Sequence, residues 1–398
     1  MTKSQIVVAL LFLLAPLAAQ TPDPSTLPLV QQADLVTLGG FRVPNDTVGG
    51  DFSYGGVAAA FQPAGPSLFL ASGDNKVAEI SIPAELHSEL TMMPRAVMIQ
   101  GFVDILSAHK TEVGPNPADV LGGLLVHNGL LAGSAFIYYD ANDTQERSHF
   151  SHSLTLTNRA SFRGFSQLGQ SRKPGFVAGP MTPIPIEWQA KLGGNALTGQ
   201  CCLSIISRTS YGPSAFAIDA AQIGLLTVPA TGLLYYPSDH PTLGPWNGSN
   251  PTYGGTTQIG GMVIVPGTRT LLYFGSNGVG AFCYGDGSTL NPPPPGECYD
   301  PMASGKGQHA YPYNYQVWAY DLNDLAAVKA KRKQPWDVKP YGVWRLDLPS
   351  APPVRIASVA IDPATKTIYA VQFRGEGPPG GQALPVVWAL RANVASPR

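Results

Sequence analysis

Glycine and proline are unusually frequent in this sequence and limit what it can fold into. The 398 residues include 44 Gly and 38 Pro, about one residue in five, against about 12% in average proteins. Both residues interrupt long helices, so the composition excludes helical solenoids and coiled coils. Only 13% of residues are Asp, Glu, Lys or Arg and 44% are hydrophobic, a balance typical of chains with a large core. We therefore predict a compact all-β protein with many turns.

The charge balance excludes two classes of partner. The chain has 25 basic and 26 acidic residues, and its formal net charge is -1. Proteins that bind nucleic acids or anionic membranes through electrostatics carry a basic excess. The composition therefore predicts neither a nucleic-acid partner nor attraction to a membrane surface.

The first 20 residues have the pattern of a secretory signal peptide. Lys3 provides the positive start, residues 6–14 are apolar, and small residues around Ala19 provide a cleavage site. A membrane anchor is the alternative, but the apolar run is shorter than the ~20 residues of a spanning helix. We therefore predict a protein located outside the cytoplasm, periplasmic or secreted, with no membrane insertion after cleavage. Residues 21–34 contain three prolines and are expected to form an extended leader.

Four cysteines in an exported protein predict disulfide bonds. Cys283 and Cys298 flank a proline-rich segment that a bridge between them would close. Cys201 and Cys202 are adjacent and would then pair with each other or stay reduced. In the alternative pairing, each of them bonds to one of the other two cysteines, and the spacing leaves this open.

A repeated order of features predicts a β-propeller. Four stretches begin with an apolar strand, continue through a turn into a second strand rich in Leu, Tyr or Phe, and end in a third strand. Their first strands are residues 55–61, 122–126, 260–265 and 356–361. A fifth, irregular copy spans residues 175–219, with residues 203–208 and 214–219 as its later strands.

The N-terminal segment resembles a fourth strand that lacks the three strands before it. Residues 35–43 contain a Gly-Gly-Phe sequence, and similar outer strands are expected at 96–105 and 161–168. A propeller joins its ends when one terminus completes the blade begun by the other. We therefore predict that residues 35–398 form a single β-propeller, of five four-stranded blades, with residues 35–43 completing the ring. Six or seven blades remain an alternative.

Two short segments carry a resemblance to known propellers. The turn containing Asp362 and Pro363 lies between two predicted strands, and residues 317–321 read Val-Trp-Ala-Tyr-Asp. Both resemble bacterial propeller repeats, including the quinoprotein-like and cell-surface types. The resemblance covers about a tenth of the chain, and it implies an architecture rather than an activity.

The two longest predicted loops indicate where a ligand would bind. Residues 238–258 and 276–315 should meet at one mouth of the central channel, since binding residues concentrate on long loops held by a rigid scaffold. Aromatic rings beside imidazole and carboxylate groups suit a small polar, ring-shaped ligand such as a sugar. Packing of the loops themselves is the alternative role of these side chains. The candidate ligand-binding residues are His240, Trp246, Tyr253, Asp300, Lys306, His309 and Tyr311.

The sequence favours binding over catalysis. It lacks the G-x-S-x-G, H-E-x-x-H, Walker A and dinucleotide motifs. It predicts no metal site and leaves the cofactor unknown. The four clear first strands contain no carboxylate, so a glycosidase would have to use loop residues such as Asp51, Asp119 or Asp300. We predict a secreted propeller that binds a small polar ligand or glycan. The alternatives are a glycan-cleaving hydrolase or lyase, and a structural propeller with a surface protein partner.

Overall fold

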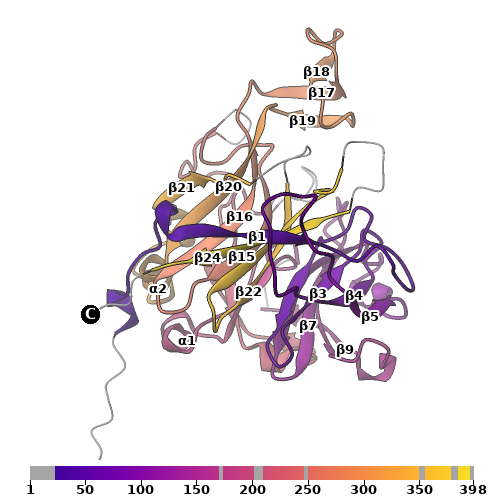
Figure 1. Cartoon of the computed structure of the whole chain (residues 1–398). Coiled ribbons are helices and arrows are strands. Elements are labelled where there is room, and N and C mark those ends of the chain that lie inside the picture. Colours follow the sequence, from indigo (N-terminus) through magenta and orange to yellow (C-terminus); the bar gives the residue numbers. More distant parts are fainter. Residues whose placement is uncertain are drawn as a thin grey trace, which may run out of the picture.

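The computed structural model describes residues 23–169, 174–200, 209–245, 250–348, 355–377 and 384–394. The predicted signal peptide therefore lies outside the described residues. Strands dominate the described parts, and the α-helices there are the short α1 (Ile186–Leu192) and α2 (Leu322–Lys329). No helix within these ranges has the length and apolar character needed to cross a membrane. The prediction of an all-β protein is confirmed (Figure 1).

In the described ranges, five mainly antiparallel sheets of four or more strands follow one another along the chain. The first sheet contains β2 (Ala59–Gln62), β3 (Ser67–Ala71), β4 (Val77–Ser81) and β5 (Met98–Val103). The second contains β6 (Val120–His127), β7 (Leu130–Phe136), β8 (His149–Ser153), β9 (Arg163–Leu168) and the parallel edge strand β13 (Thr227–Val228). The third contains β10 (Met181–Pro183), β11 (Ala196–Thr198), β12 (Ala215–Ile218) and β14 (Ala230–Leu234). The fourth contains β15 (Gln258–Ile264), β16 (Thr270–Gly278), β20 (Tyr313–Asp321) and β21 (Gly342–Arg345).

The last sheet combines the two ends of the chain. Its strand order is β1-β24-β23-β22, where β1 is Leu35–Arg42, β22 is Ile356–Asp362, β23 is Thr367–Gln372 and β24 is Val386–Ala392. The first strand runs antiparallel to the last, with Leu35 opposite Ala392 and Arg42 opposite Val386. The N-terminal strand thus supplies the fourth strand of a sheet whose other members come from the C-terminus, as the sequence predicts.

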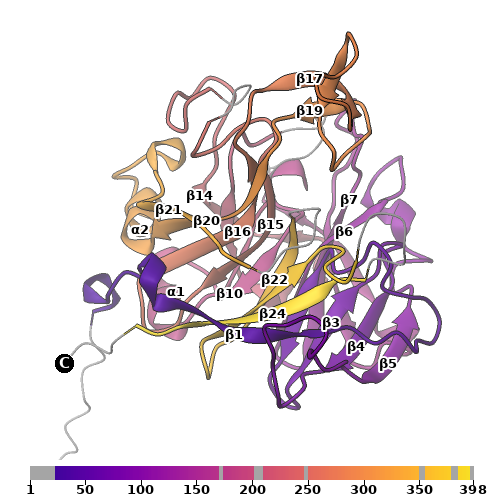
Figure 2. The same ribbon diagram turned by 45° about the horizontal axis from the view of Figure 1, so that its top comes forward.

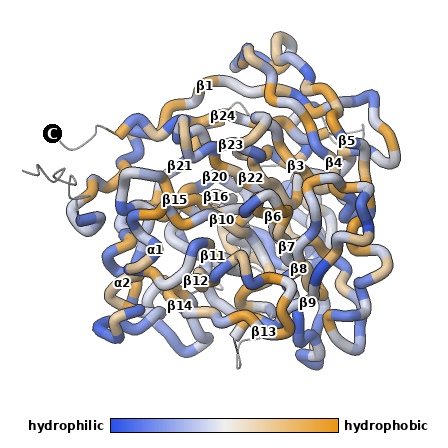
Figure 3. Tube along the Cα trace, turned by 90° about the horizontal axis from the view of Figure 1, so that it is seen from below, coloured by the Kyte–Doolittle hydropathy of each residue, from blue (hydrophilic) through white to orange (hydrophobic). Residues whose placement is uncertain are grey.

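The five first strands gather around a common centre. Contacts join β2 to β6, β6 to β10, β10 to β15, β15 to β22, and β22 back to β2. Figure 3 shows β6, β10, β15 and β22 near the middle of the molecule, with β1, β5, β9 and β14 at its periphery. Such a radial order of sheets is typical of β-propellers.

Glycines allow the first strands to approach each other closely. A Cβ atom added to Gly122 in β6 would lie 2.0 Å from the carbonyl oxygen of Ala178, just before β10. A Cβ atom added to Gly260 in β15 would likewise lie 2.0 Å from the carbonyl oxygen of Ile356 in β22. Since any larger residue would collide with neighbouring backbone, these positions require glycine.

The third sheet departs most from the sequence prediction. The predicted strand at 214–219 corresponds to β12, whereas the predicted strand at 203–208 lies outside the described residues. The second strand of this sheet is instead β11, Ala196–Thr198, which the sequence analysis missed. Three residues are too few to show an alternating pattern, so the repeat is hidden at this point.

A buried histidine links the second sheet to the third. His149 is fully buried; its Nδ1 lies 2.8 Å from the Ser148 Oγ, and its Nε2 lies 2.9 Å from the Thr198 Oγ1. The Thr198 hydroxyl donates to the carbonyl oxygen of Val177 at 2.5 Å, so it accepts from the His149 Nε2–H. One ring nitrogen then donates and the other accepts, which is the pattern of neutral imidazole. Burial lowers the pKa of His149 to about 3.

We predict that this histidine makes the fold sensitive to mild acid. The unfolded chain binds a proton near pH 6.5, but the folded chain does so only near pH 3. The stability that neutral His149 contributes is therefore complete above pH 6.5 and is lost as the pH falls toward 3, by about 1.4 kcal/mol per pH unit. Urea unfolding at pH 7 and pH 4.5 measures the effect. The loss of unfolding free energy between pH 7 and pH 4.5 should be smaller in His149→Gln than in the wild type and unchanged in His87→Gln. An equal loss in His149→Gln and the wild type would contradict the prediction.

Candidate functional site

Two long loops emerge at the same end of the fourth sheet. The loop 235–257 leads into β15, and an insert at 279–312 connects β16 to β20. Gln258 at the start of β15 pairs with Ser276 near the end of β16. Both loops thus lie where the first strand of the sheet begins, as expected from the sequence. We name this end of the five sheets the upper face.

The insert folds into a small sheet of its own. Its strands are β17 (Cys283–Ser288), β18 (Glu297–Tyr299) and β19 (Gly307–His309). β17 pairs in parallel with β18 and antiparallel with β19. Figures 1 and 2 show this three-stranded sheet projecting beyond the five larger sheets.

A disulfide bond fixes the insert. The sulfur atoms of Cys283 and Cys298 are bonded, with the two Cα atoms 5.7 Å apart. The predicted pairing of these two cysteines is confirmed, and the alternative pairing with Cys201 or Cys202 is excluded for them. Cys201 and Cys202 themselves lie outside the described residues.

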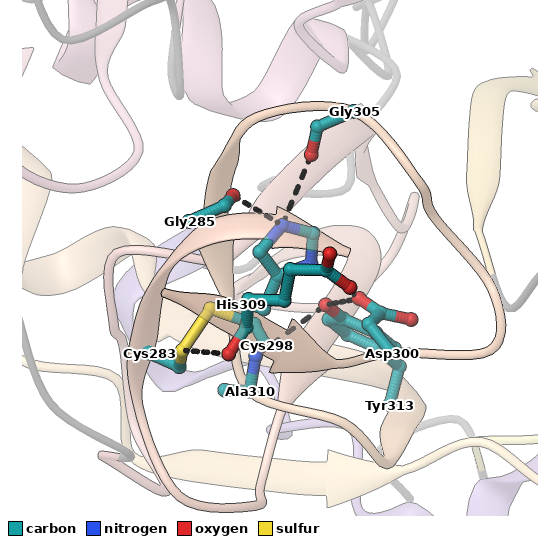
Figure 4. The surroundings of a disulfide bond; sticks show 9 residues. Cys283, Gly285, Cys298, Asp300, Gly305, His309, Ala310 and Tyr313 are labelled. Carbon is teal, nitrogen blue, oxygen red and sulfur yellow. Dashed lines mark hydrogen bonds and ion pairs between the residues drawn. A yellow bond between two sulfur atoms is a disulfide. The ribbon is translucent and has the colours of Figure 1, made fainter. Parts of the chain in front are cut away.

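Three polar side chains form a buried network beside the disulfide (Figure 4). The Asp300 Oδ2 lies 2.7 Å from the His309 Nδ1 and accepts a hydrogen bond from the Tyr313 hydroxyl at 2.6 Å. The His309 Nε2 lies 3.2 Å from the carbonyl oxygen of Gly285 and 3.1 Å from that of Gly305. Each of these partners of the imidazole is a hydrogen-bond acceptor. Burial, followed by the hydrogen bond to Asp300, raises the pKa of Tyr313.

This network serves the insert itself. Asp300 is 1% exposed and His309 is 3% exposed, and the polar atoms of both side chains already have partners within the insert. They join the end of β19 to the segment after β18, so they position the aromatic side chains that the insert carries. A ligand-binding role for Asp300 and His309 stays a prediction.

The predicted residues of the loop 235–257 lie deeper than expected. Tyr253 is 1% exposed and packs in the core. His240 is partly buried; its Nδ1 accepts from the Thr242 amide at 3.1 Å, and its ring lies 4.8 Å from that of Tyr236. Burial lowers the pKa of His240, so this side chain is a neutral hydrogen-bonding group at pH 7. Trp246 lies outside the described residues.

The remaining predicted residues lie on the insert. Lys306 is exposed in the segment before β19. The Tyr311 ring lies 5.5 Å from the Tyr299 ring and 6.3 Å from the Tyr313 ring, edge to face in both cases. The structure does not bring His240, Lys306 and Tyr311 together through any hydrogen bond or ring contact within the described residues.

An apolar cavity of about 120 Å³ occupies the centre of the sheets. Its walls are side chains from the later halves of all five first strands, and they include Phe61, Leu125, Met181, Val263 and Ile361. Among the described lining residues, Thr182 is polar and the others are apolar, so no carboxylate lines the cavity. The described lining of this cavity therefore contains neither of the two acids that glycoside hydrolysis needs.

Aromatic side chains missed by the sequence analysis gather on the upper face. Tyr54 precedes β2 and is 59% exposed, and its ring lies 6.3 Å from that of Phe373, which follows β23. Tyr138 and Tyr139 follow β7, are 41% and 70% exposed, and pack edge to face at 5.1 Å. Arg355 lies over the Phe373 ring at 5.0 Å. The sequence did contain a signal for Phe373, Tyr138 and Tyr139, because each of these aromatic residues follows shortly after the predicted second strand of a repeat.

Comparisons with known proteins assign no family. No protein-family profile and no curated protein match the sequence. Solved structures similar to this one include a glycosyl hydrolase from Bacteroides ovatus, with 10% identity, a TM-score of 0.43, and coverage of 92% of this chain and 96% of that one. A luciferin-regenerating enzyme has 8% identity and a TM-score of 0.33, with coverage of 92% and 95%. At this distance the likenesses indicate neither activity nor ligand.

We predict that Asp300 holds the insert together. Asp300→Ala removes the acceptor shared by His309 and Tyr313 and leaves buried donors unsatisfied, at a cost of about 1–3 kcal/mol each. The insert should then be cleaved at least about tenfold faster in limited proteolysis. Asp286→Ala, which removes an exposed carboxylate from the same insert, is the matched control and should leave the cleavage rate unchanged. Equal cleavage of the two variants would refute the structural role of Asp300.

Proposed function

We propose that this chain is an exported, five-bladed β-propeller that binds a glycan on its upper face. The cyclic contacts between the five first strands support one propeller with five blades. The pairing of β1 with β24 supports closure by the N-terminal strand. The disulfide in the insert supports an oxidising compartment, periplasmic or extracellular.

The exposed aromatic cluster is the observation that carries this proposal. Tyr54, Tyr138 and Tyr139 keep between 41% and 70% of their area exposed on loops held by rigid sheets. Sugars have apolar ring faces that pack on aromatic planes, and polar edges that need hydrogen-bonding groups. Tyrosine offers both an apolar face and a hydroxyl, so the cluster suits a saccharide.

The carboxylates of the chain favour binding over hydrolysis. The central cavity has none among its described lining residues, and Asp300 is committed to its buried network. Asp51 and Asp119 are exposed on the upper loops, and each accepts from a backbone amide, at 2.7 and 2.8 Å. A hydrolase that used Asp51 and Asp119 remains the second candidate, and turnover of a bound glycan would favour it.

A glycan screen with matched tyrosine variants tests the proposal. Residues 21–398 are titrated against a glycan array, and each hit is measured by calorimetry with Tyr54→Ala and Tyr284→Ala. Both tyrosines are 59% exposed, but Tyr54 lies in the aromatic cluster and Tyr284 lies on the insert. Affinity should fall about tenfold, or ~1.4 kcal/mol, in Tyr54→Ala alone. Loss in Tyr284→Ala alone would place the site on the insert, and the absence of any bound glycan would refute the function.

A further inference from the structure

Two arginines lie against rings of the aromatic cluster. The guanidinium carbon of Arg355 lies 5.0 Å from the centre of the Phe373 ring, and that of Arg374 lies 5.3 Å from the centre of the Tyr54 ring. The two rings are 6.3 Å apart. The planes of the two rings are tilted by 48°, and each ring has one guanidinium group over it. The Phe373 amide also donates to the carbonyl oxygen of Arg355 at 2.9 Å.

Neither arginine has an anionic partner in the part of the chain that the structure describes. No hydrogen bond or ion pair links the side chain of Arg355 or Arg374 to another described residue. The Nε atom of Arg374 is buried without a hydrogen-bond partner. The nearby carboxylate of Glu376 is engaged elsewhere, since both of its oxygens bind Arg95 at 2.7 Å.

Without a bound ligand, this arrangement of the two arginines costs the protein free energy. Burial lowers the pKa of Arg355, so its guanidinium is partly stripped of water. Tyr54 and Arg374 both have positive φ angles, 56° and 54°, in a region that residues other than glycine rarely adopt. Partly desolvated cations on strained backbone cluster at binding sites, where a ligand supplies the missing interactions.

We propose that Arg355 and Arg374 bind the anionic group of an acidic saccharide whose ring packs against Tyr54 and Tyr138. The inference rests on the proposed glycan-binding function and narrows it to one class of ligand. The planar fork of arginine matches a carboxylate or a sulfate ester through paired hydrogen bonds. Two guanidinium groups fit one or two anionic groups, and the net charge of -1 provides no extended basic surface for a longer polyanion.

Binding of matched tetrasaccharides tests this inference. The probes are a galacturonic acid tetramer, a sulfated galactan tetramer and the neutral galactan tetramer, measured by calorimetry at low salt. One acidic tetramer should bind at least about tenfold tighter than the neutral one, and added salt should reduce the difference. The preferred acidic probe identifies the anionic group as a carboxylate or a sulfate.

Arginine variants show whether these side chains carry the preference. Arg355→Gln and Arg374→Gln should each reduce binding of the acidic tetramer at least about tenfold and leave the neutral tetramer unchanged. Arg391→Gln removes the same charge from the far end of β24 and should change neither. Neutral glycans bound as tightly as acidic ones would overturn this inference and leave the glycan-binding function standing. No binding to any glycan would refute the function itself.

The melting temperature separates a binding role from a structural one. Because neither guanidinium has an ion-pair partner among the described residues, Arg355→Gln and Arg374→Gln should melt within about 3 °C of the wild type. A loss of 10 °C or more in both variants would show that the arginines support the fold, and would overturn the proposal.

Discussion

The antiparallel pairing of β1 with β24 is the interaction on which the rest of the structure depends. β24 would otherwise expose an unpaired edge, and such edges promote aggregation. With Leu35 opposite Ala392 and Arg42 opposite Val386, the first and last strands of the chain share one sheet. The two ends of the chain are thereby held together, and the five first strands can surround one apolar centre.

Much of the fold could be predicted from the sequence, because most strands keep a local pattern. Gly260 and Gly122 mark first strands whose close approach requires glycine, and the outer strand at 35–43 was predicted almost to the residue. β11 was missed because it has three residues, and β13 was missed because a parallel edge pair depends on a distant partner, β9. Such tertiary pairings leave no periodic signal along the chain.

The candidate site was harder to predict, because its residues come together only in three dimensions. The long insert drew attention to Asp300 and His309, which the structure places in an internal network. Tyr54, Tyr138 and Arg355 lie on three separate connections between strands, and none of these connections is distinctive by itself. Loop length directed the sequence analysis to the upper face, whereas the unpaired cations and exposed rings became visible only in the folded chain.

Hydrogen exchange of the β1 amides tests most directly whether the N-terminal strand closes a single propeller. In the paired register, Val36 and Phe41 lie opposite Arg391 and Val387 of β24. The ladder amides of β1 should then exchange as slowly as those of β24, through global unfolding. If the β1 amides exchanged as fast as those of the exposed loop 45–51 while β24 stayed protected, the strand would not close the structure and the account would be wrong.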